Sequence, residues 1–387
     1  MKDLIQFCQS VRQVEIIEAI VKHGSVRKGA KAIGLSERNA FQAVARIKKY
    51  AALRGHSPDH DMDKVVPDGF KVKGVSTYYD KEGQKAGQWV KSGIDEERRQ
   101  ELIKAAMDAM CGEILPLPMS PNPVSGTYRE DLCNLFTFTD FHLGMLAWHK
   151  EGGADWDLKI AEAVLWDSFR KMIDSSPKAK TAVLNIQGDF LHSDGLLPVT
   201  PTNKHVLDQD GRFSKIITVA IRVLRRLIDH SLATHEVVHL LIIEGNHDEA
   251  SSIWLRKMFE ALYENEPRLT VNDSELPYYV YQHGSVMLAF HHGHKLKNEQ
   301  LPMLFAAQFP QMWGATTKRY CHTGHRHHLD EKEYSGMIVT QHPTLSARDA
   351  YAARGGWIAE RAAMAITYHS KAGQYGRVFI SPELLDV

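Results

Sequence analysis

Cysteine is scarce in this chain of 387 residues, which has only four. Cys8, Cys111, Cys133 and Cys321 lie far apart, and no two of them form a Cys-x-x-Cys pair. This spacing indicates neither a disulfide framework nor a cysteine-based zinc site. No apolar run is long enough to span a membrane, and the first residues lack the pattern of a signal peptide. We therefore expect a reduced, cytoplasmic protein without a membrane partner.

The chain also lacks an overall charge, because 47 Lys and Arg are balanced by 47 Asp and Glu. The balance is uneven along the sequence. Residues 1–57 contain 11 Lys or Arg against 4 Asp or Glu, so this segment carries a charge of +7 and the remainder −7. A basic segment joined to an acidic body suggests contact with an anionic polymer such as DNA. The length predicts more than one domain.

Five hydrophobic segments each end in residues that are able to bind metals. In α/β proteins the carboxyl ends of such strands line the ligand site. We therefore expect the five ends to converge on one place. In chain order they are Asp140-Phe141-His142, Gly188-Asp189, Gly245-Asn246-His247-Asp248, His291-His292-Gly293-His294 and Gly324-His325-Arg326-His327.

The mixture of carboxylate, amide and imidazole ligands indicates which ions these ends would bind. It suits Mn, Fe or Zn, whereas calcium and magnesium sites are nearly all oxygen. Two such ions can clamp the attacking and leaving oxygens of a phosphate ester, and one carboxylate usually bridges them. Asp189 is the candidate for that bridge. A single histidine is more often an ordinary core or surface residue, but five ordered clusters are improbable by chance.

The order Asp-x-His, Gly-Asp, Gly-Asn-His-Asp, His-Gly, Gly-His-x-His resembles the calcineurin-like metallophosphoesterases, from about residue 132 to the C-terminus. The resemblance implies an α/β fold, the two-sheet αββα sandwich, that holds two divalent metal ions, with Mn favoured and Fe or Zn as alternatives. The fourth motif fits His291 or His292, of which we favour His292. The resemblance implies one metal on Asp140, His142, Asp189 and His327, and the other on Asp189, Asn246, His292 and His325.

Three further residues receive catalytic roles from this resemblance. In the family the histidine at the position of His247 does not bind metal but faces the phosphate, where it stabilises charge or protonates the leaving oxygen. Asp248 could orient it. The second motif is similar to that of double-strand-break repair nucleases, in which a histidine at the position of His192 assists exonuclease chemistry. Protein phosphatases instead have Gly-Asp-x-x-Asp-Arg, so phosphodiester hydrolysis is favoured, although His192 could also be a plain loop residue.

The basic N-terminal segment has the pattern of a helix-turn-helix. Gly24 would end a first helix, Ser25 and Ser36 would cap a second and a third, and Ala30 stands four residues before Gly34. The pattern resembles small regulators and resolvases, although such helices also serve as protein-docking modules. Four residues of the third helix would face DNA, with phosphate contact favoured over sequence recognition: Arg38, Asn39, Gln42 and Arg46.

The rest of the chain completes the expected organisation. We expect a helix-turn-helix domain at 1–57, a connector at 58–131 and a catalytic domain at 132–387. The connector would hold a hairpin over residues 70–91, a helix over 94–114 and a stiff linker around Pro116, Pro118, Pro121 and Pro123. Catalytic-domain helices are expected at about 157–173, 213–232 and 252–264.

This domain order resembles helix-turn-helix metallophosphoesterases encoded by bacteriophages, which would place the protein in the host cytoplasm. The sequence analysis favours a metal-dependent DNA nuclease with DNA as its partner. Two alternatives stay open. One is a phosphomonoesterase, or a nucleotide or protein phosphatase, that the N-terminal module localises. The other is a DNA-binding regulator with a vestigial catalytic fold. The sequence does not indicate an oligomeric state.

Overall fold

The computed structural model describes residues 1–387 apart from 61, 64, 68, 83, 114–127, 202, 203, 386 and 387. The expected proline linker at Pro116, Pro118, Pro121 and Pro123 lies outside the described residues. The chain folds into two compact units, Met1–Glu101 and Leu102–Val387, which are described separately. None of the helices in the described part of the chain has the length and apolar character that crossing a membrane requires.

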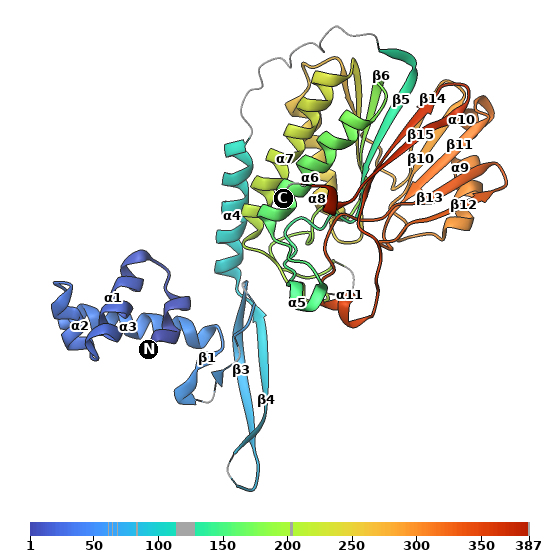
Figure 1. Ribbon diagram of the computed structural model, residues 1–387. Coiled ribbons are helices and arrows are strands. Elements are labelled where there is room, and N and C mark those ends of the chain that lie inside the picture. Colours follow the sequence, from blue (N-terminus) through green and yellow to red (C-terminus); the bar gives the residue numbers. More distant parts are fainter. Residues whose placement is uncertain are drawn as a thin grey trace. The chain divides into compact units, whose positions relative to one another are not determined.

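The first unit begins with a cluster of short helices: η1 (Lys2–Phe7), α1 (Val11–His23), α2 (Val26–Ala32) and α3 (Glu37–Leu53) (Figure 1). Serines cap the three α-helices, as Ser10, Ser25 and Ser36 accept hydrogen bonds from backbone amides of the first turns. Apolar side chains from η1, α1 and α3 form one small core, including Ile17 and Ile47. This core holds the helices together.

Two glycines determine how α1, α2 and α3 connect. Gly34 adopts the left-handed conformation, with φ of 68°, in the turn before α3. At Gly29, an added Cβ would lie 2.8 Å from backbone atoms of Ile20, so this glycine marks the closest approach of α2 to α1. Sequence reasoning assigned that approach to Ala30, which is buried but is the neighbouring residue. The helices are present, while a helix-turn-helix function stays a prediction.

A β-hairpin completes the first unit and is joined to α3. The remaining elements are β1 (His56–Ser57), η2 (Pro58–His60), β2 (Met62–Asp63), β3 (Phe70–Tyr79) and β4 (Lys85–Ile94), and α4 (Glu96–Glu113) follows. Arg54, which follows α3, donates hydrogen bonds to the carbonyls of Pro67 and Phe70. These hydrogen bonds hold the start of the hairpin against the end of α3.

The second unit contains two mixed β-sheets. The six-stranded sheet has the order β15-β14-β5-β6-β7-β8, and the five-stranded sheet has the order β12-β13-β11-β10-β9. The strands are β5 (Arg129–Phe138), β6 (Ala179–Ile186), β7 (Val237–Ile242), β8 (Leu269–Val271), β9 (Tyr279–His283), β10 (Val286–Phe290), β11 (Lys318–Thr323), β12 (Asp330–Tyr334), β13 (Met337–Gln341), β14 (Ala363–His369) and β15 (Gly373–Ile380).

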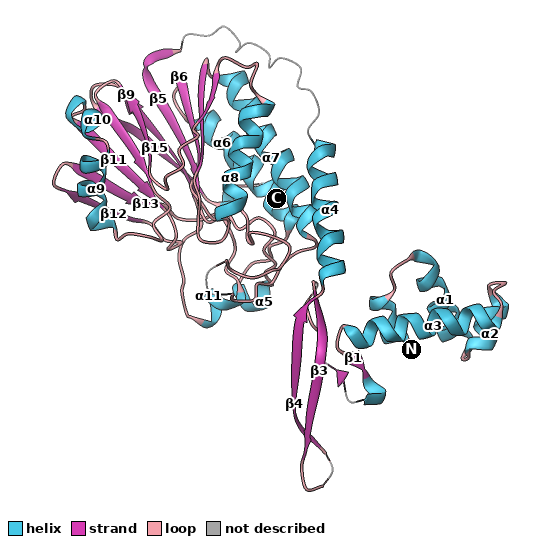
Figure 2. Ribbon diagram, turned by 180° about the vertical axis from the view of Figure 1, so that it is seen from behind, coloured by secondary structure: helices cyan, strands magenta, loops and turns pink. Residues whose placement is uncertain are grey.

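Helices cover the outer faces of the two sheets (Figures 1 and 2). The six-stranded sheet is covered by α6 (Leu158–Ser175), α7 (Phe213–Thr234) and α8 (Glu249–Leu262). The five-stranded sheet is covered by α9 (Leu301–Gln308) and α10 (Pro310–Ala315). The shorter elements are α5 (His149–Gly152), η3 (Asn298–Gln300), α11 (Ala350–Arg354) and η4 (Pro382–Leu384).

Alternation along the strands builds three apolar layers. In β10, Val286, Leu288 and Phe290 pack between the sheets. Their neighbours Met287 and Ala289 pack against α9. The same two-residue period in β5 and β6 fills the space between the sheets and the space below α6 and α7. The expected α/β fold with two sheets is thereby confirmed, and the expected helix positions hold to within a few residues.

Candidate metal centre

The loops that follow the five predicted strands lie close together, and they come from both sheets. β5, β6 and β7 are parallel neighbours in one sheet, and β10 and β11 are parallel neighbours in the other. Parallel strands end at the same edge of a sheet, so the loops after them lie side by side. The loops carry Asp140 and His142, Asp189, Asn246 and His247, His292, and His325 with His327.

Three groups of metal-binding side chains form there among the described residues, each with its ligand atoms within 4.8 Å of one another. Two of them contain predicted ligands only: the first consists of Asp140, His142 and His327, and the second of Asp189, His292 and His325. The third consists of His142, His192 and His247. The first two groups adjoin, because His292 Nε2 lies 3.2 Å from Asp189 Oδ2 and 3.8 Å from Asp140 Oδ1. The structure thus brings together six of the seven predicted ligands as two adjacent groups.

Backbone strain is concentrated on these residues. Six non-glycine residues in the described part of the chain have positive φ, and five of them are predicted ligands, whereas the sixth is Lys204. Each such conformation costs about 1–3 kcal/mol and persists only where the surrounding structure enforces it. Such clustering is typical of functional loops. The five are Asp140, His142, Asp189, His325 and His327, with φ between 49° and 72°.

Buried polar atoms without hydrogen bonds show how the residues fit metal ions. Asp140 Oδ1, His292 Nε2 and Asn246 Oδ1 are buried and make no hydrogen bond of normal geometry. Asn246, the seventh predicted ligand, therefore has an uncommitted oxygen. Burying unpaired polar atoms is costly unless they bind something. The donor set of carboxylate oxygen, amide oxygen and imidazole nitrogen fits divalent ions of the Mn, Fe and Zn type.

In several predicted ligands, the polar atom that would not bind metal makes a hydrogen bond within the protein. Asp140 Oδ2 accepts hydrogen bonds from Thr139 Oγ1 at 2.6 Å and from the His325 amide at 2.8 Å. Asp189 Oδ1 accepts one from the His247 amide at 2.7 Å. His292 Nδ1 donates to the Gln187 carbonyl at 2.8 Å, which leaves Nε2 for a metal. Such outer contacts orient metal ligands and fix the tautomers of the histidines.

Two motif glycines make room for the carboxylates. A Cβ on Gly245 would clash with Asp189 Oδ1, and one on Gly324 would clash with the side chains of Thr139 and Asp140. Any larger residue would displace the groups that the glycines now accommodate. The glycines of the third and fifth motifs therefore have a steric role in the site.

The surroundings favour the metal-binding protonation states of Asp140 and His142, but not those of His292 and His327. Burial would lower the pKa of both histidines, but Asp189 and Asp140 outweigh it for His292 and raise its pKa to about 10, and Asp140 outweighs it for His327 and raises its pKa. Burial alone would raise the pKa of Asp140, but His327 and His292 outweigh it and hold that pKa below its usual value. Burial lowers the pKa of His142 well below its ordinary value, and His247 and His327 add to the effect. The carboxylate is therefore ionised and the imidazole of His142 neutral at neutral pH, as metal ligation requires.

The structure separates the two histidines of the fourth motif. His292 faces Asp140 and Asp189, whereas His291 Nδ1 donates to the carbonyl of Pro277 at 3.0 Å. The His291 ring lies against Tyr278, with centroids 4.9 Å apart. The position expected for the ligand is thus occupied by His292.

His247 lies beside the first group, and its ring is held through Nδ1, as the ring of His292 is. Its Nδ1 donates to the His192 carbonyl at 2.9 Å, so Nε2 is the nitrogen left for a further partner. The sequence analysis expected Asp248 to orient His247. The Asp248 carboxylate instead accepts hydrogen bonds from the backbone amides of Asp189, Leu191 and Gly245, because it is buried beneath these loops. Asp248 therefore fixes two ligand loops.

His192 lies behind His142, away from solvent. Its side chain is only 2% exposed, and its Nδ1 is 3.4 Å from His142 Nδ1. Because His142 Nε2 faces His327 at 3.3 Å, His192 contacts the opposite nitrogen of this ligand. Burial lowers the pKa of His192 to about 3, with a smaller effect from His247. This placement suits a residue that positions His142 better than one that touches substrate.

Sequence reasoning missed several residues that support the site. The hydroxyls of Thr344 and Ser346 donate to the Asp140 carbonyl at 2.7 and 3.0 Å. The Asp194 carboxylate accepts hydrogen bonds from the amides of Ala250 and Ser251 at the start of α8. His294 Nδ1 is a further buried atom without a hydrogen bond, next to His292. Only His294, within a run of histidines, carried any signal in the sequence.

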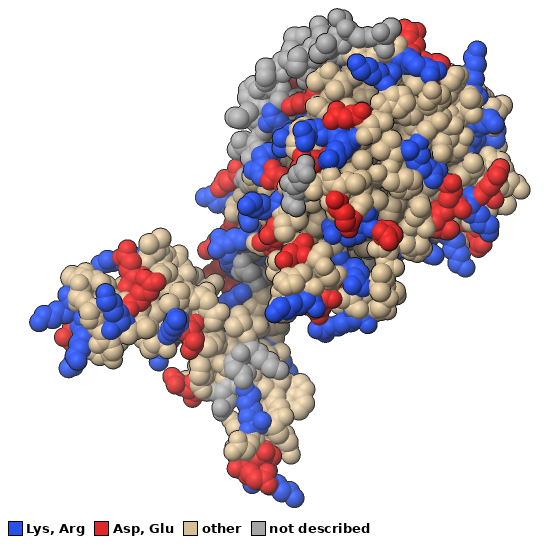
Figure 3. All heavy atoms as spheres, in the orientation of Figure 1, with Lys and Arg blue, Asp and Glu red and all other residues tan. Residues whose placement is uncertain are grey.

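The four predicted DNA contacts belong to the first unit. Arg38, Asn39, Gln42 and Arg46 are all exposed on α3. The opposite side of α3 is buried, through Ala40, Val44 and Ile47. Figure 3 shows Lys and Arg side chains on the visible surface of these helices.

No protein-family model and no curated protein matches this sequence. Solved structures are similar over about two thirds of the chain. Yfce, a phosphoesterase from E. coli, is 14% identical, with a TM-score of 0.32 over 64% of this chain and 100% of its own. A novel archaeal phosphodiesterase is 10% identical, with a TM-score of 0.31 over 64% of this chain and 99% of its own. Vps29 from Entamoeba histolytica, in a complex with zinc, is 12% identical, with a TM-score of 0.29 over 64% and 99%.

Proposed function

We propose that the second unit is a phosphoesterase that uses two divalent metal ions. The observation that carries this proposal is the pair of adjacent, mostly buried groups, Asp140, His142 and His327 beside Asp189, His292 and His325, with unpaired ligand atoms. Asp189 would bridge the two ions, and Asn246 would complete the second group. The ions would supply Lewis acidity and a water molecule of lowered pKa as the nucleophile.

The protein's own residues would orient the ester and manage its charge. His247, with Nδ1 fixed on a carbonyl, presents Nε2 to a phosphate oxygen and would donate a proton or a hydrogen bond as the leaving group departs. His192 would hold the ring of His142 in place. Asp248 would hold the Asp189 loop against the Asn246 loop, so that the ligands of the second ion keep their spacing.

We further propose that the substrate is a phosphodiester, with DNA as the favoured polymer. The basic first 57 residues and the four exposed polar residues of α3 support this choice, because phosphate contacts dominate the affinity of proteins for nucleic acids. A phosphomonoesterase would not need such a surface. A vestigial site would not be expected to retain strained, buried ligands with unpaired atoms.

A comparison of substrates tests these alternatives. The protein loaded with Mn would be assayed on linear, circular and single-stranded DNA, and on bis-nitrophenyl and mononitrophenyl phosphate. We expect hydrolysis of DNA and of the bis-nitrophenyl diester to exceed hydrolysis of the monoester. Preference for the monoester would establish a phosphatase instead. Metal binding without any hydrolysis would support the regulator with a vestigial site.

A further inference from the structure

The β3–β4 hairpin of the first unit has two faces of different character. Strand residues directly opposite each other share a face, and the register pairs Gly74 with Lys91, Ser76 with Trp89, and Tyr78 with Gly87. We call the face formed by these six residues the aromatic face. The alternate residues, including Val75 and Thr77, form the other face.

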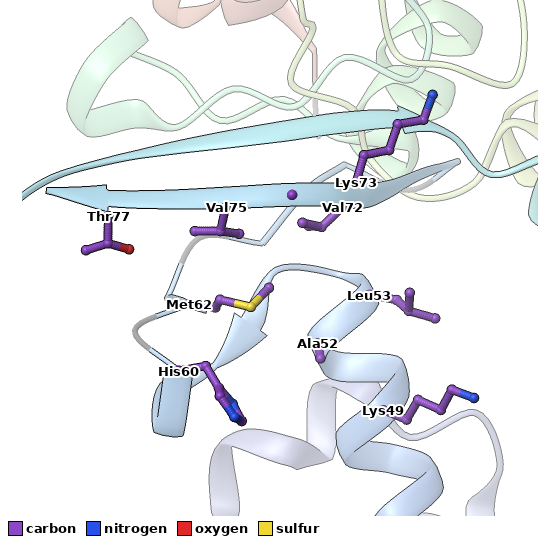
Figure 4. A pocket seen from close by; sticks show the side chains of 10 residues that line it. Lys49, Ala52, Leu53, His60, Met62, Val72, Lys73, Val75 and Thr77 are labelled. Atoms are coloured by element: carbon purple, nitrogen blue, oxygen red, sulfur yellow. The ribbon is translucent and has the colours of Figure 1, made fainter.

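The other face is covered by the first unit itself. Figure 4 shows Val72, Val75 and Thr77 pointing toward Met62 and the end of α3, where they line a pocket. A bulge between Val72 and Gly74 brings both valines to this face. In the same view Lys73, the bulged residue, points away from the pocket. The hairpin is therefore anchored through one face, and its aromatic face is directed outward.

Large aromatic side chains are exposed on the aromatic face. Trp89 is 67% exposed and Tyr78 is 62% exposed. They occupy diagonal positions of the register, close enough to form one surface. Beside them are the glycines at 74 and 87, where an added Cβ would meet nothing within 4 Å. Most of the surface of the two rings is thus exposed to solvent, and no side chain at these two glycine positions covers it.

Lysines accompany the rings, and carboxylates are absent from the two strands. β3 and β4 contain Lys71, Lys73, Lys85 and Lys91 but no Asp or Glu. Lys91 lies on the aromatic face, next to Trp89 in the register. The side chain of Lys73 reaches this face by crossing over Gly93, because an added Cβ there would lie 2.6 Å from Lys73 Nζ. The face therefore has cations toward its base and aromatic rings toward its tip.

We propose that the aromatic face binds single-stranded nucleic acid, with bases stacked on Trp89 and Tyr78 and phosphates near Lys73 and Lys91. Exposed rings beside a cationic path are the arrangement that binds unpaired bases, since every base offers a flat face for stacking. A duplex hides those faces. Pairing of a second copy along the strand edges is disfavoured by the lysines on both strands. The inference rests on the proposed function in one respect, the choice of a phosphodiester polymer.

The test measures binding of a fluorescently labelled oligothymidylate to the full-length protein, by anisotropy, in EDTA so that no hydrolysis occurs. Trp89→Ala should weaken binding by roughly 5- to 150-fold, and Trp89→Phe should restore most of the loss. The dependence of affinity on salt should stay unchanged in Trp89→Ala. Lys73→Ala and Lys91→Ala should each lower its slope by about 0.7 if each contacts one phosphate.

Tyr375→Ala is the matched control, because Tyr375 is 53% exposed but belongs to β15 of the other unit. It should leave the affinity unchanged. Three results would overturn the proposal: unchanged affinity of Trp89→Ala, competition by a blunt duplex as strong as by the single strand, or light scattering that shows a dimer lost on replacing Trp89.

The outcome is separable from that of the proposed function. A protein that hydrolyses the bis-nitrophenyl diester but binds the oligonucleotide without Trp89 refutes this inference alone. A protein that binds through Trp89 and hydrolyses no phosphoester refutes the proposed function alone.

Discussion

The two units carry their candidate functional residues in opposite ways. In the second unit most of the predicted metal ligands are buried, and five of the seven have positive φ. Several also have their second polar atom fixed by the protein. In the first unit the candidate contact residues, on α3 and on the hairpin, are exposed. Metal chemistry needs fixed geometry, whereas contact with a flexible polymer tolerates mobile side chains. Substitutions should therefore have large effects in the second unit and smaller, salt-dependent effects in the first.

The largest contrast is expected between two adjacent histidines of the second unit. His292→Ala removes a ligand that faces Asp140 and Asp189, so hydrolysis of a phosphodiester should fall to the background level. Even loss of an outer partner of a metal ligand typically costs 10- to 100-fold. His291→Ala is the matched control and should keep most activity, because His291 binds the Pro277 carbonyl. Steady-state rates at saturating metal distinguish the two variants, and the reverse ranking would exchange their roles.

His247→Ala should keep both metals yet lose on the order of 10² to 10⁴ in turnover, since it removes a proton donor or a charge-stabilising group. The defect can be compared on DNA and on a nitrophenyl diester, whose leaving group needs little protonation. A smaller defect on the nitrophenyl substrate indicates a general acid, and equal defects indicate charge stabilisation. Loss of metal from this variant would instead show that His247 is a ligand.

A buried histidine away from the site should make the second unit sensitive to acid. Burial holds the pKa of His235 at about 4, below its ordinary value. The unfolded chain takes up a proton below about pH 6.5, while the folded chain does not. Its contribution to stability is thus complete above pH 6.5 and is lost as the pH falls toward 4, by up to about 3 kcal/mol.

His235→Gln lacks this titration. The free energy of unfolding in urea, measured at pH 7 and near pH 4, should therefore fall less in the variant than in the natural protein. An equal fall in both proteins would contradict the assignment to His235.

The smallest effects are expected on α3. Arg38→Ala and Arg46→Ala should each reduce the slope of log affinity for duplex DNA against log salt by about 0.9, if each contacts one phosphate. Arg12→Ala, an exposed arginine of α1 paired with Glu15, is the control and should change the slope less. Filter binding at several salt concentrations measures the slopes. Equal changes in all three variants would mean that only total charge matters.

The sequence was enough to predict which strands end in candidate ligands. Both the residue type and its place after a hydrophobic run are local properties of the sequence. Asp140, Asp189 and His327 could each be identified from a short sequence motif alone. The role of Asp248 was not predictable, since its carboxylate reaches amides of Asp189 and Leu191, which lie 59 and 57 residues away in sequence.

The burial of His192 behind His142, 50 residues away, likewise follows from packing of two loops. Thr344 and Ser346 follow β13 and reach Asp140 across more than 200 residues, without any motif to mark them. The aromatic face of the hairpin could not be predicted without the pairing register of the two strands, because the bulge at Lys73 decides which residues share a face. Local chemistry was therefore predictable, and contacts between distant segments were not.

The metal content of the protein tests the central claim most directly. Elemental analysis after saturation with Mn and removal of free metal should give two ions per chain. Asp189→Ala should lose both, because a bridging carboxylate serves both ions and its loss leaves the remaining ligands of each group incomplete. Circular dichroism would verify that the variant is folded. Two ions per chain in a folded Asp189→Ala protein, or none in the natural protein, would contradict the dimetal site.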